Sequence, residues 1–192
     1  MLQRHAAAPG FRKLGTAKAA LGESPIWSPA DACIWWVDVT GRRLLRSAAA
    51  GGAADEWPMP EEIGFAALFA PGGVVVGLES GLFAFDPGSG ALDRLLPLEA
   101  RGVRFNDATT DATGRLWAGT MDLRNERPVG QLLRIDVDLS VTVIEDGMRT
   151  PNGLAVDEAR GRLYLSDSHR DVRTIWSRDL DLASGALGEK RV

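Results

Sequence analysis

The sequence predicts an all-β protein, a partial β-propeller built from about four similar units. The first observation is a series of short runs rich in β-branched and aromatic residues, at residues 34–39, 73–79, 82–86, 115–120, 131–137, 141–146, 162–167 and 173–178. Turn sequences such as DPGSG and ATG separate these runs. The second observation is that no segment carries a sustained helical period with caps at both ends. Together they favour strands throughout.

The repeat gives the strands their order. Segments starting at Ala32, Gly72, Gly114 and Gly161 follow one another about 40 to 47 residues apart, which is the period of a four-stranded propeller blade. A blade buries its faces only against neighbouring blades, so such units stack around an axis. A β-sandwich is the alternative all-β fold, but nothing in a sandwich requires this period. We expect a disordered leader over residues 1–12 and a single propeller domain over residues 13–192.

Composition narrows the class of protein. The chain has 192 residues, of which 45% are apolar and 25% charged, so it can form one domain with a core. A net charge of −4 gives no basic surface for nucleic acid, and no apolar run approaches the roughly 18 residues of a membrane-spanning helix. The start lacks the apolar segment of a secretion signal. The single cysteine, Cys33, excludes an internal disulfide and predicts a cytoplasmic protein. We interpret Cys33 as a small buried residue.

Polar side chains recur at matching places before the blade turns. Glu23, Asn106 and Asn152 each precede their turn by eight or nine residues. These places lie at the mouths of the innermost strands, which line the central channel of a propeller. The side chains, together with Arg104, are therefore predicted to meet in one axial pocket. The second unit has Ile63 or Gly64 at this place, which we expect to supply pocket wall.

Each of these residues also has a plainer explanation. Asn106 with Asp107, and Asn152 with Gly153, are common turn dipeptides. Glu23 and Arg104 are compatible with solvated surface charges. The matched positions favour a site over separate turns.

Two connections are expected to return to the face that holds the pocket. They are residues 121–131 in the third unit and residues 166–171 in the fourth, and we expect both to overhang the pocket as lids. The second contains His169, which has no second histidine at metal-binding spacing, so we interpret it as a loop residue. Residues 11–20 are expected to be the strand that closes the propeller.

The sequence resembles the gluconolactonase/regucalcin (senescence-marker-protein-like) family of sugar-lactone lactonases. The resemblance rests on LGESPIW, WWVDV, RFNDATTDATGRLWAGTM and PNGLAVDEARGRLYLSD, which stand in the family's order and spacing. It implies a six-bladed propeller, of which this chain would hold about four blades, with the C-terminal ones missing. It also implies hydrolysis of a sugar lactone, such as gluconolactone, with one divalent cation: calcium, zinc, magnesium, manganese or iron.

The resemblance assigns roles residue by residue. Glu23 and Asn152 match the family's metal ligands, and Arg104 and Asn106 match its substrate-binding positions. The family's third ligand and proposed general base is an aspartate expected beyond Val192, so the catalytic residue here is unassigned. Relatives also place a substrate-contacting acid shortly after the GTM motif, where this chain has Asp122 followed by leucine and arginine. That contact is unassigned as well.

Two functions therefore remain open. One is metal-dependent hydrolysis of a sugar lactone to an aldonic acid, an activity that the expected loss of the C-terminal blades would impair in this chain, with a small-molecule substrate and neither nucleic acid nor membrane as partner. The alternative is a non-catalytic propeller fragment that serves as a divalent-metal-binding or interaction scaffold.

Overall fold

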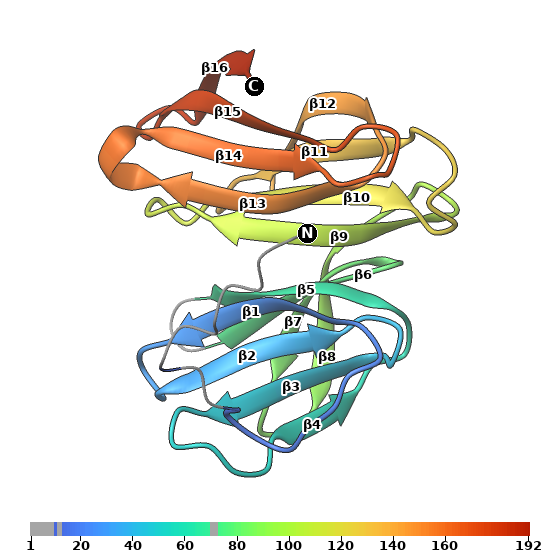
Figure 1. Ribbon diagram of the computed structural model, residues 1–192, viewed down its shortest axis with the longest axis vertical. Coiled ribbons are helices and arrows are strands. Elements are labelled where there is room, and N and C mark those ends of the chain that lie inside the picture. The colour runs from blue at the N-terminus through green and yellow to red at the C-terminus, as the bar shows by residue number, and fades with distance from the viewer. Residues whose placement is uncertain (1–9, 11–12, 70–72) are drawn as a thin grey trace, which may run out of the picture.

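The computed structural model describes Gly10, residues 13–69 and residues 73–192, which form four antiparallel four-stranded sheets that follow one another along the chain (Figure 1). The first two sheets contain β1 (Gly22–Ser28), β2 (Cys33–Asp38), β3 (Arg43–Ala48) and β4 (Asp55–Pro58), then β5 (Ile63–Phe69), β6 (Gly73–Leu78), β7 (Gly81–Asp86) and β8 (Ala91–Pro97). The last two contain β9 (Val103–Thr110), β10 (Leu116–Asp122), β11 (Gly130–Ile135) and β12 (Val141–Met148), then β13 (Pro151–Asp157), β14 (Arg162–Asp167), β15 (Thr174–Asp181) and β16 (Ala186–Arg191).

The sheets are the blades of a propeller, so the predicted all-β propeller arrangement is confirmed. Within each blade every strand pairs with its chain neighbour. Of the predicted blade starts, Ala32, Gly114 and Gly161 lie in the connections between the first and second strands, whereas Gly72 lies outside the described residues. The expected leader, residues 1–12, also lies outside them except for Gly10. Within the described part of the chain, no helix is long and apolar enough to cross a membrane.

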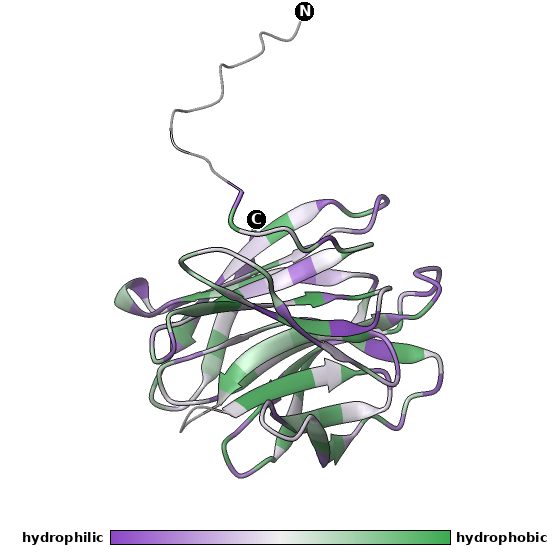
Figure 2. Ribbon diagram, turned by 90° about the horizontal axis from the view of Figure 1, so that it is seen from below, coloured by the Kyte–Doolittle hydropathy of each residue, from purple (hydrophilic) through white to green (hydrophobic). Residues whose placement is uncertain are grey.

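The core lies between neighbouring blades. One apolar cluster joins the first and second blades, with Trp35 and Val76 among its members, and another joins the second and third. A third cluster, which includes Trp117 and Leu163, joins the third and fourth. Figure 2 shows hydrophobic residues concentrated along the strands. Because each blade buries its faces against the next, the blades hold one another in place around the axis.

Some expectations about single residues need correction. Trp35 and Trp117 are buried in the blade cores, whereas Trp27 in β1 is 48% exposed. Cys33 is only half-buried, because it begins β2 next to the exposed turn from β1. Residues 13–20, within the expected closing strand, lie along the first blade, where Gly15 forms a parallel bridge to Gly52.

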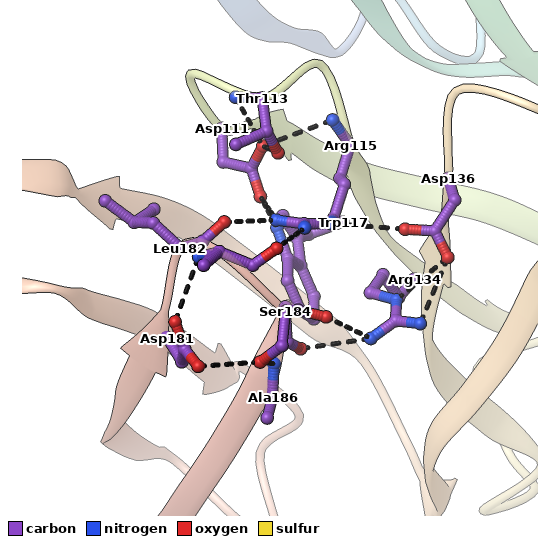
Figure 3. Close-up of polar contacts among 12 residues, drawn as sticks. Asp111, Thr113, Arg115, Trp117, Arg134, Asp136, Asp181, Leu182, Ser184 and Ala186 are labelled. Carbon is purple, nitrogen blue, oxygen red and sulfur yellow. Dashed lines mark hydrogen bonds and ion pairs between the residues drawn. The ribbon is translucent and has the colours of Figure 1, made fainter.

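Two arginines connect the third blade to the fourth (Figure 3). Arg115 donates hydrogen bonds to the carbonyl oxygens of Leu182 and Ala183, each over 2.8 Å. Arg134 donates to the carbonyl oxygen of Gly185 over 3.1 Å. These carbonyls belong to the turn between β15 and β16, so the two guanidinium groups hold this turn against the third blade. At the same junction between blades, β9 and β13 lie side by side.

Candidate functional site

One cavity brings the predicted site residues together. It has a volume of about 200 Å³ and is lined by Leu21, Glu23, Val39, Gly64, Arg104, Asn106, Asp107, Met121, Asn125, Thr150 and Asn152. All four residues singled out from the sequence, Glu23, Arg104, Asn106 and Asn152, are in this set. A second hollow of about 340 Å³ continues along the axis between β1, β5, β9 and β13, and Glu23, Asp107 and Asn152 line both.

The strand register shows which positions are equivalent. Glu23 pairs with Val37, one residue before the end of β2, and Asn152 pairs with Ser166, one residue before the end of β14. In the third blade the residue at this place is Arg104, which pairs with Met121. The expectation that Asn106 is the equivalent of Glu23 and Asn152 is therefore wrong by two residues. The reason is that β9 has 8 residues where β1 and β13 have 7, and its turn to β10 is longer.

Asn106 reaches the cavity for a different reason, which is a β-bulge. The register of β9 shifts between Phe105 and Ala108, so Asn106 and Asp107 stand opposite a single residue of β10. A bulge bends its strand and redirects side chains, and bulges are common beside active sites. Sequence reasoning missed Asp107 because the Asn-Asp pair resembles a turn. Two consecutive polar residues inside a strand, which break the alternation of period two, are the signal that could have identified it.

Arg104 is a buried cation and not the surface charge that was the plainer explanation. Its residue is 7% exposed, and its Nη1 donates to the carbonyl oxygen of Phe105 and to Oδ1 of Asn106, each over 2.9 Å. Its Nε lies 3.2 Å from Oε2 of Glu62, at an angle unsuited to a hydrogen bond. Burial lowers the pKa of Arg104, and the negative charges of Glu62, Glu79 and Glu23 partly offset this effect. The guanidinium remains charged near neutral pH.

Asn106 and Asp107 both contact the fourth blade. Nδ2 of Asn106 donates to the carbonyl oxygen of Pro151, and Oδ2 of Asp107 accepts from the amide of Leu154, each over 2.9 Å. The other carboxylate oxygen of Asp107 accepts from the amide of Ala108. Burial raises the pKa of Asp107, and the backbone hydrogen bonds oppose that rise.

Glu23 and Asn152 offer oxygen atoms of the kind that hard divalent cations prefer. Glu23 is exposed to the cavity, while Asn152 is half-buried and donates from Nδ2 to Oγ of Ser168 over 3.2 Å. That bond turns the amide so that Oδ1 is the free end, apart from a hydrogen bond from the Gly153 amide. Among the described residues no group of three His, Cys, Asp or Glu side chains forms a metal site. The donor set fits a cation held weakly by one carboxylate and one amide.

The connection after β10 reaches the cavity, as expected, but its acidic residue Asp122 does not line the cavity. Asp122 is 2% exposed and accepts from the amides of Glu126 and Arg127 and from the Arg127 side chain, so it caps its own loop. Asn125 lines the cavity instead, with its Oδ1 accepting from Oγ1 of Thr150 over 2.6 Å. The second expected lid, residues 166–171, contributes no lining residue in the described part of the cavity. Ser168 of this connection contacts the site indirectly, because its Oγ accepts the hydrogen bond from Nδ2 of Asn152.

His169 lies in a loop and Gly64 lines the cavity, as the sequence predicted. His169 is buried in its loop, where Nδ1 accepts from the amide of Asp171. Gly64 lines the cavity, and a Cβ there would lie 2.2 Å from the carbonyl oxygen of Phe105, so the close approach of β5 to β9 requires glycine. Ile63 is fully buried in the core and supplies no cavity wall.

Comparison with known proteins identifies the family. The sequence profile of the SMP-30/Gluconolactonase/LRE-like region matches residues 21–192. The chain belongs to this family. The family match covers all four blades and every candidate site residue.

Two relatives give a measure of the similarity. The chain is 36% identical over 156 residues to 6-deoxy-6-sulfogluconolactonase of Pseudomonas putida, an alignment that covers 80% of this chain and 54% of that protein. It is 35% identical over 160 residues to L-arabinolactonase of Azospirillum brasilense, covering 81% of this chain and 53% of the relative. The chain therefore spans about half the length of these SMP-30/gluconolactonase relatives.

Solved structures agree with this assignment. The calcium-binding protein regucalcin of Agrobacterium tumefaciens superimposes with a TM-score of 0.84 at 26% identity, covering 92% of this chain and 60% of that one. A luciferin-regenerating enzyme superimposes with a TM-score of 0.82 at 24% identity and supports the fold.

Proposed function

We propose that the cavity binds a sugar lactone beside a divalent cation and takes part in hydrolysis of the lactone to an aldonic acid. The observation that carries this proposal is the meeting of Glu23, Arg104, Asn106 and Asn152, from three blades, in one cavity. Relatives of the chain are named as lactonases for sulfogluconolactone, pentonolactone and arabinolactone. Their names support the substrate class and do not select one sugar.

Glu23 and Asn152 are the residues that would hold the cation. A solved relative is described as a calcium-binding protein, and magnesium, manganese, zinc and iron also accept oxygen ligands. When bound, such a cation polarises a carbonyl oxygen and lowers the pKa of a water molecule. The formal charge of Glu23 alone supports weak binding.

Arg104 and Asn106 would orient the sugar. The Nη1 group of Arg104 is held by the Phe105 carbonyl and by Asn106, so the guanidinium is already fixed. Its Nη2 donates to no group of the described residues and would donate to a substrate oxygen. Asn106 uses one N–H and one lone pair within the protein and keeps one of each for hydroxyl groups of the sugar. A fixed donor array costs little ordering entropy when the substrate binds.

We assign no general base among the described cavity-lining residues. Glu23 is committed to the cation in this proposal. Each oxygen of Asp107 accepts a backbone amide, and the bond from Leu154 ties the carboxylate to β13, so we give Asp107 a structural role.

The test is proton release from D-glucono-δ-lactone and L-arabinono-γ-lactone, measured with and without manganese, calcium or zinc. We expect the protein to hydrolyse the lactone faster than the spontaneous reaction. EDTA should abolish this excess rate, and Arg104→Met should reduce it at least tenfold. Because Arg104 is buried, Arg104→Lys serves as the matched variant: it keeps a charge but loses the planar donors. Cation binding without any lactone turnover would instead favour the scaffold function.

A further inference from the structure

We propose that Asp38 and Asp167 are positioning residues of the cation site, each fixing the backbone that presents one candidate ligand. Neither carboxylate lines the cavity. The inference rests on the proposed cation site and goes beyond it, since it concerns residues that touch neither cation nor substrate.

Asp38 holds the backbone that leads into β1. It is 1% exposed, and its Oδ1 accepts hydrogen bonds from the amides of Ala20 and Leu21, both over 3.0 Å, and of Gly41 over 3.1 Å. Its Oδ2 pairs with Nη2 of Arg43 over 2.6 Å. Leu21 stands two residues before Glu23, so one buried carboxylate fixes the approach of the chain to that ligand.

Asp167 does the same for β13. It is 3% exposed and accepts from the amides of Arg149 over 2.8 Å, Thr150 over 3.0 Å and His169 over 3.1 Å. Thr150 stands two residues before Asn152. As in the first blade, two amides come from the segment entering the first strand and one from the turn leaving the second.

The register makes the two arrangements equivalent. Asp38 pairs with Gly22, and Asp167 pairs with Pro151, the residues directly before Glu23 and Asn152. In both β1 and β13 a β-bulge follows the ligand directly, at residues 24–25 and 153–154. The residue after each ligand has a left-handed backbone, with φ of 50° at Ser24 and 59° at Gly153.

The left-handed serine is informative because a residue with a Cβ adopts this backbone conformation only at an energetic cost. A strained conformation persists only where the surrounding structure enforces it. The carboxylate holds the backbone that precedes each ligand, and the left-handed residue fixes the backbone that follows it, so each ligand residue is held on both sides. The shared geometry therefore aims Glu23 and Asn152 at the cavity.

The third blade lacks this arrangement. Asp122 pairs with Val103, directly before Arg104, but its carboxylate accepts amides of its own loop and none from the segment entering β9. Among the described residues, a carboxylate that accepts three backbone amides in this way occurs in the two blades that carry candidate cation ligands. Outer groups that orient metal ligands typically change affinity by about 10- to 100-fold when removed.

The experiment measures Mn²⁺ affinity by calorimetry on the full chain, for the wild type, Asp38→Asn and Asp167→Asn. The control is Asp111→Asn. Asp111 is also buried and accepts amides from Thr113 and Arg115, but it lies in the turn between β9 and β10, and it lines neither the cavity nor the axial hollow. Urea unfolding of every variant shows whether the control loses a similar amount of stability.

We expect Kd for Mn²⁺ to rise about 10- to 100-fold in both test variants, and less than about threefold in Asp111→Asn. If an Asn variant does not fold, Asp→Glu at the same position replaces it, because Glu keeps the charge and shifts the oxygens by one methylene. Unchanged Kd in the test variants, or an equal loss in the control, would overturn the positioning role while leaving the cation site intact. A wild-type chain that binds no Mn²⁺ would overturn the cation site itself.

Discussion

Oδ2 of Asp107, in the third blade, accepts a hydrogen bond from the backbone amide of Leu154, in the fourth, over 2.9 Å. The neighbouring Asn106 donates to the carbonyl oxygen of Pro151 over the same distance. The two bonds meet β13 on either side of Asn152. The bulge of β9 therefore clamps the strand segment that carries a candidate cation ligand, and the geometry of the site depends on the junction between these blades.

Removing the Asp107 carboxylate should weaken this junction. In Asp107→Ala the Leu154 amide loses its acceptor inside the protein, which costs about 1 to 3 kcal/mol of unfolding free energy. Urea denaturation measures the difference. Asp138→Ala is the control, because Asp138 is exposed and accepts the amide of Ser140 within its own turn. If both variants unfold at the same urea concentration as the wild type, the clamp has no energetic weight.

Glu23→Gln should remove cation binding, because it deletes the formal charge among the two candidate ligands while preserving shape. We expect Kd for Mn²⁺ or Ca²⁺ to rise at least about tenfold in calorimetry, since affinity for hard cations depends on ligand charge. Glu158→Gln is the matched control, an exposed glutamate in the 3-10 turn η1 (Glu158–Arg160). His169→Ala should leave cation affinity unchanged. Tight binding that survives Glu23→Gln would show that the cation lies elsewhere.

Asn125 provides a test of the lid. Its backbone is left-handed, with φ of 54°, and its side chain accepts from Thr150. Both Asn125→Gly and Asn125→Ala lose that hydrogen bond, but alanine also keeps the backbone strain. We expect the alanine variant to be less stable than the glycine variant by about 1 kcal/mol. Equal melting temperatures would mean that the loop relaxes and that Asn125 is not fixed over the cavity.

Acid should destabilise the fold through Asp38. Burial raises the pKa of Asp38, but hydrogen bonds from Leu21, Arg43, Ala20 and Gly41 outweigh it and lower the pKa to about 2. The unfolded value is about 3.9, so the stabilisation is fully present above pH of about 4 and is lost as pH falls toward 2. Thermal melts across this range should show the loss in the wild type and a smaller slope in Asp38→Asn. A slope that the substitution leaves unchanged would assign the acid sensitivity to other carboxylates.

The blades and two of the site residues were readable from the sequence because they follow from local spacing. Strand composition and turn glycines recur with the blade period, and Glu23 and Asn152 stand at the same distance from their turns. The structure brings both to one cavity. In these two blades the first strands have equal length, so counting residues along the chain gives the correct register.

The remaining features depend on pairing, which spacing does not specify. Counting residues back from the turn matched Asn106, and not Arg104, to Glu23 and Asn152, because β9 is longer than β1 and β13. Asp107 enters the cavity through a bulge, and Asn125 through a left-handed residue that Thr150 holds from another blade. The contact between Asn125 and Thr150 joins residues distant in the chain, so no local pattern reveals it, whereas the consecutive polar pair Asn106 and Asp107 is a local signal of the bulge.

A crystal structure of the chain grown with Mn²⁺ would show whether Glu23 and Asn152 hold a cation, because the anomalous signal of manganese locates the ion without assumption. We expect one peak in the cavity, within about 2.0 to 2.6 Å of a carboxylate oxygen of Glu23 and of Oδ1 of Asn152, with Arg104 facing the open side of the ion. A peak bound to other side chains, or no peak in a crystal where millimolar Mn²⁺ reaches the cavity, would contradict it.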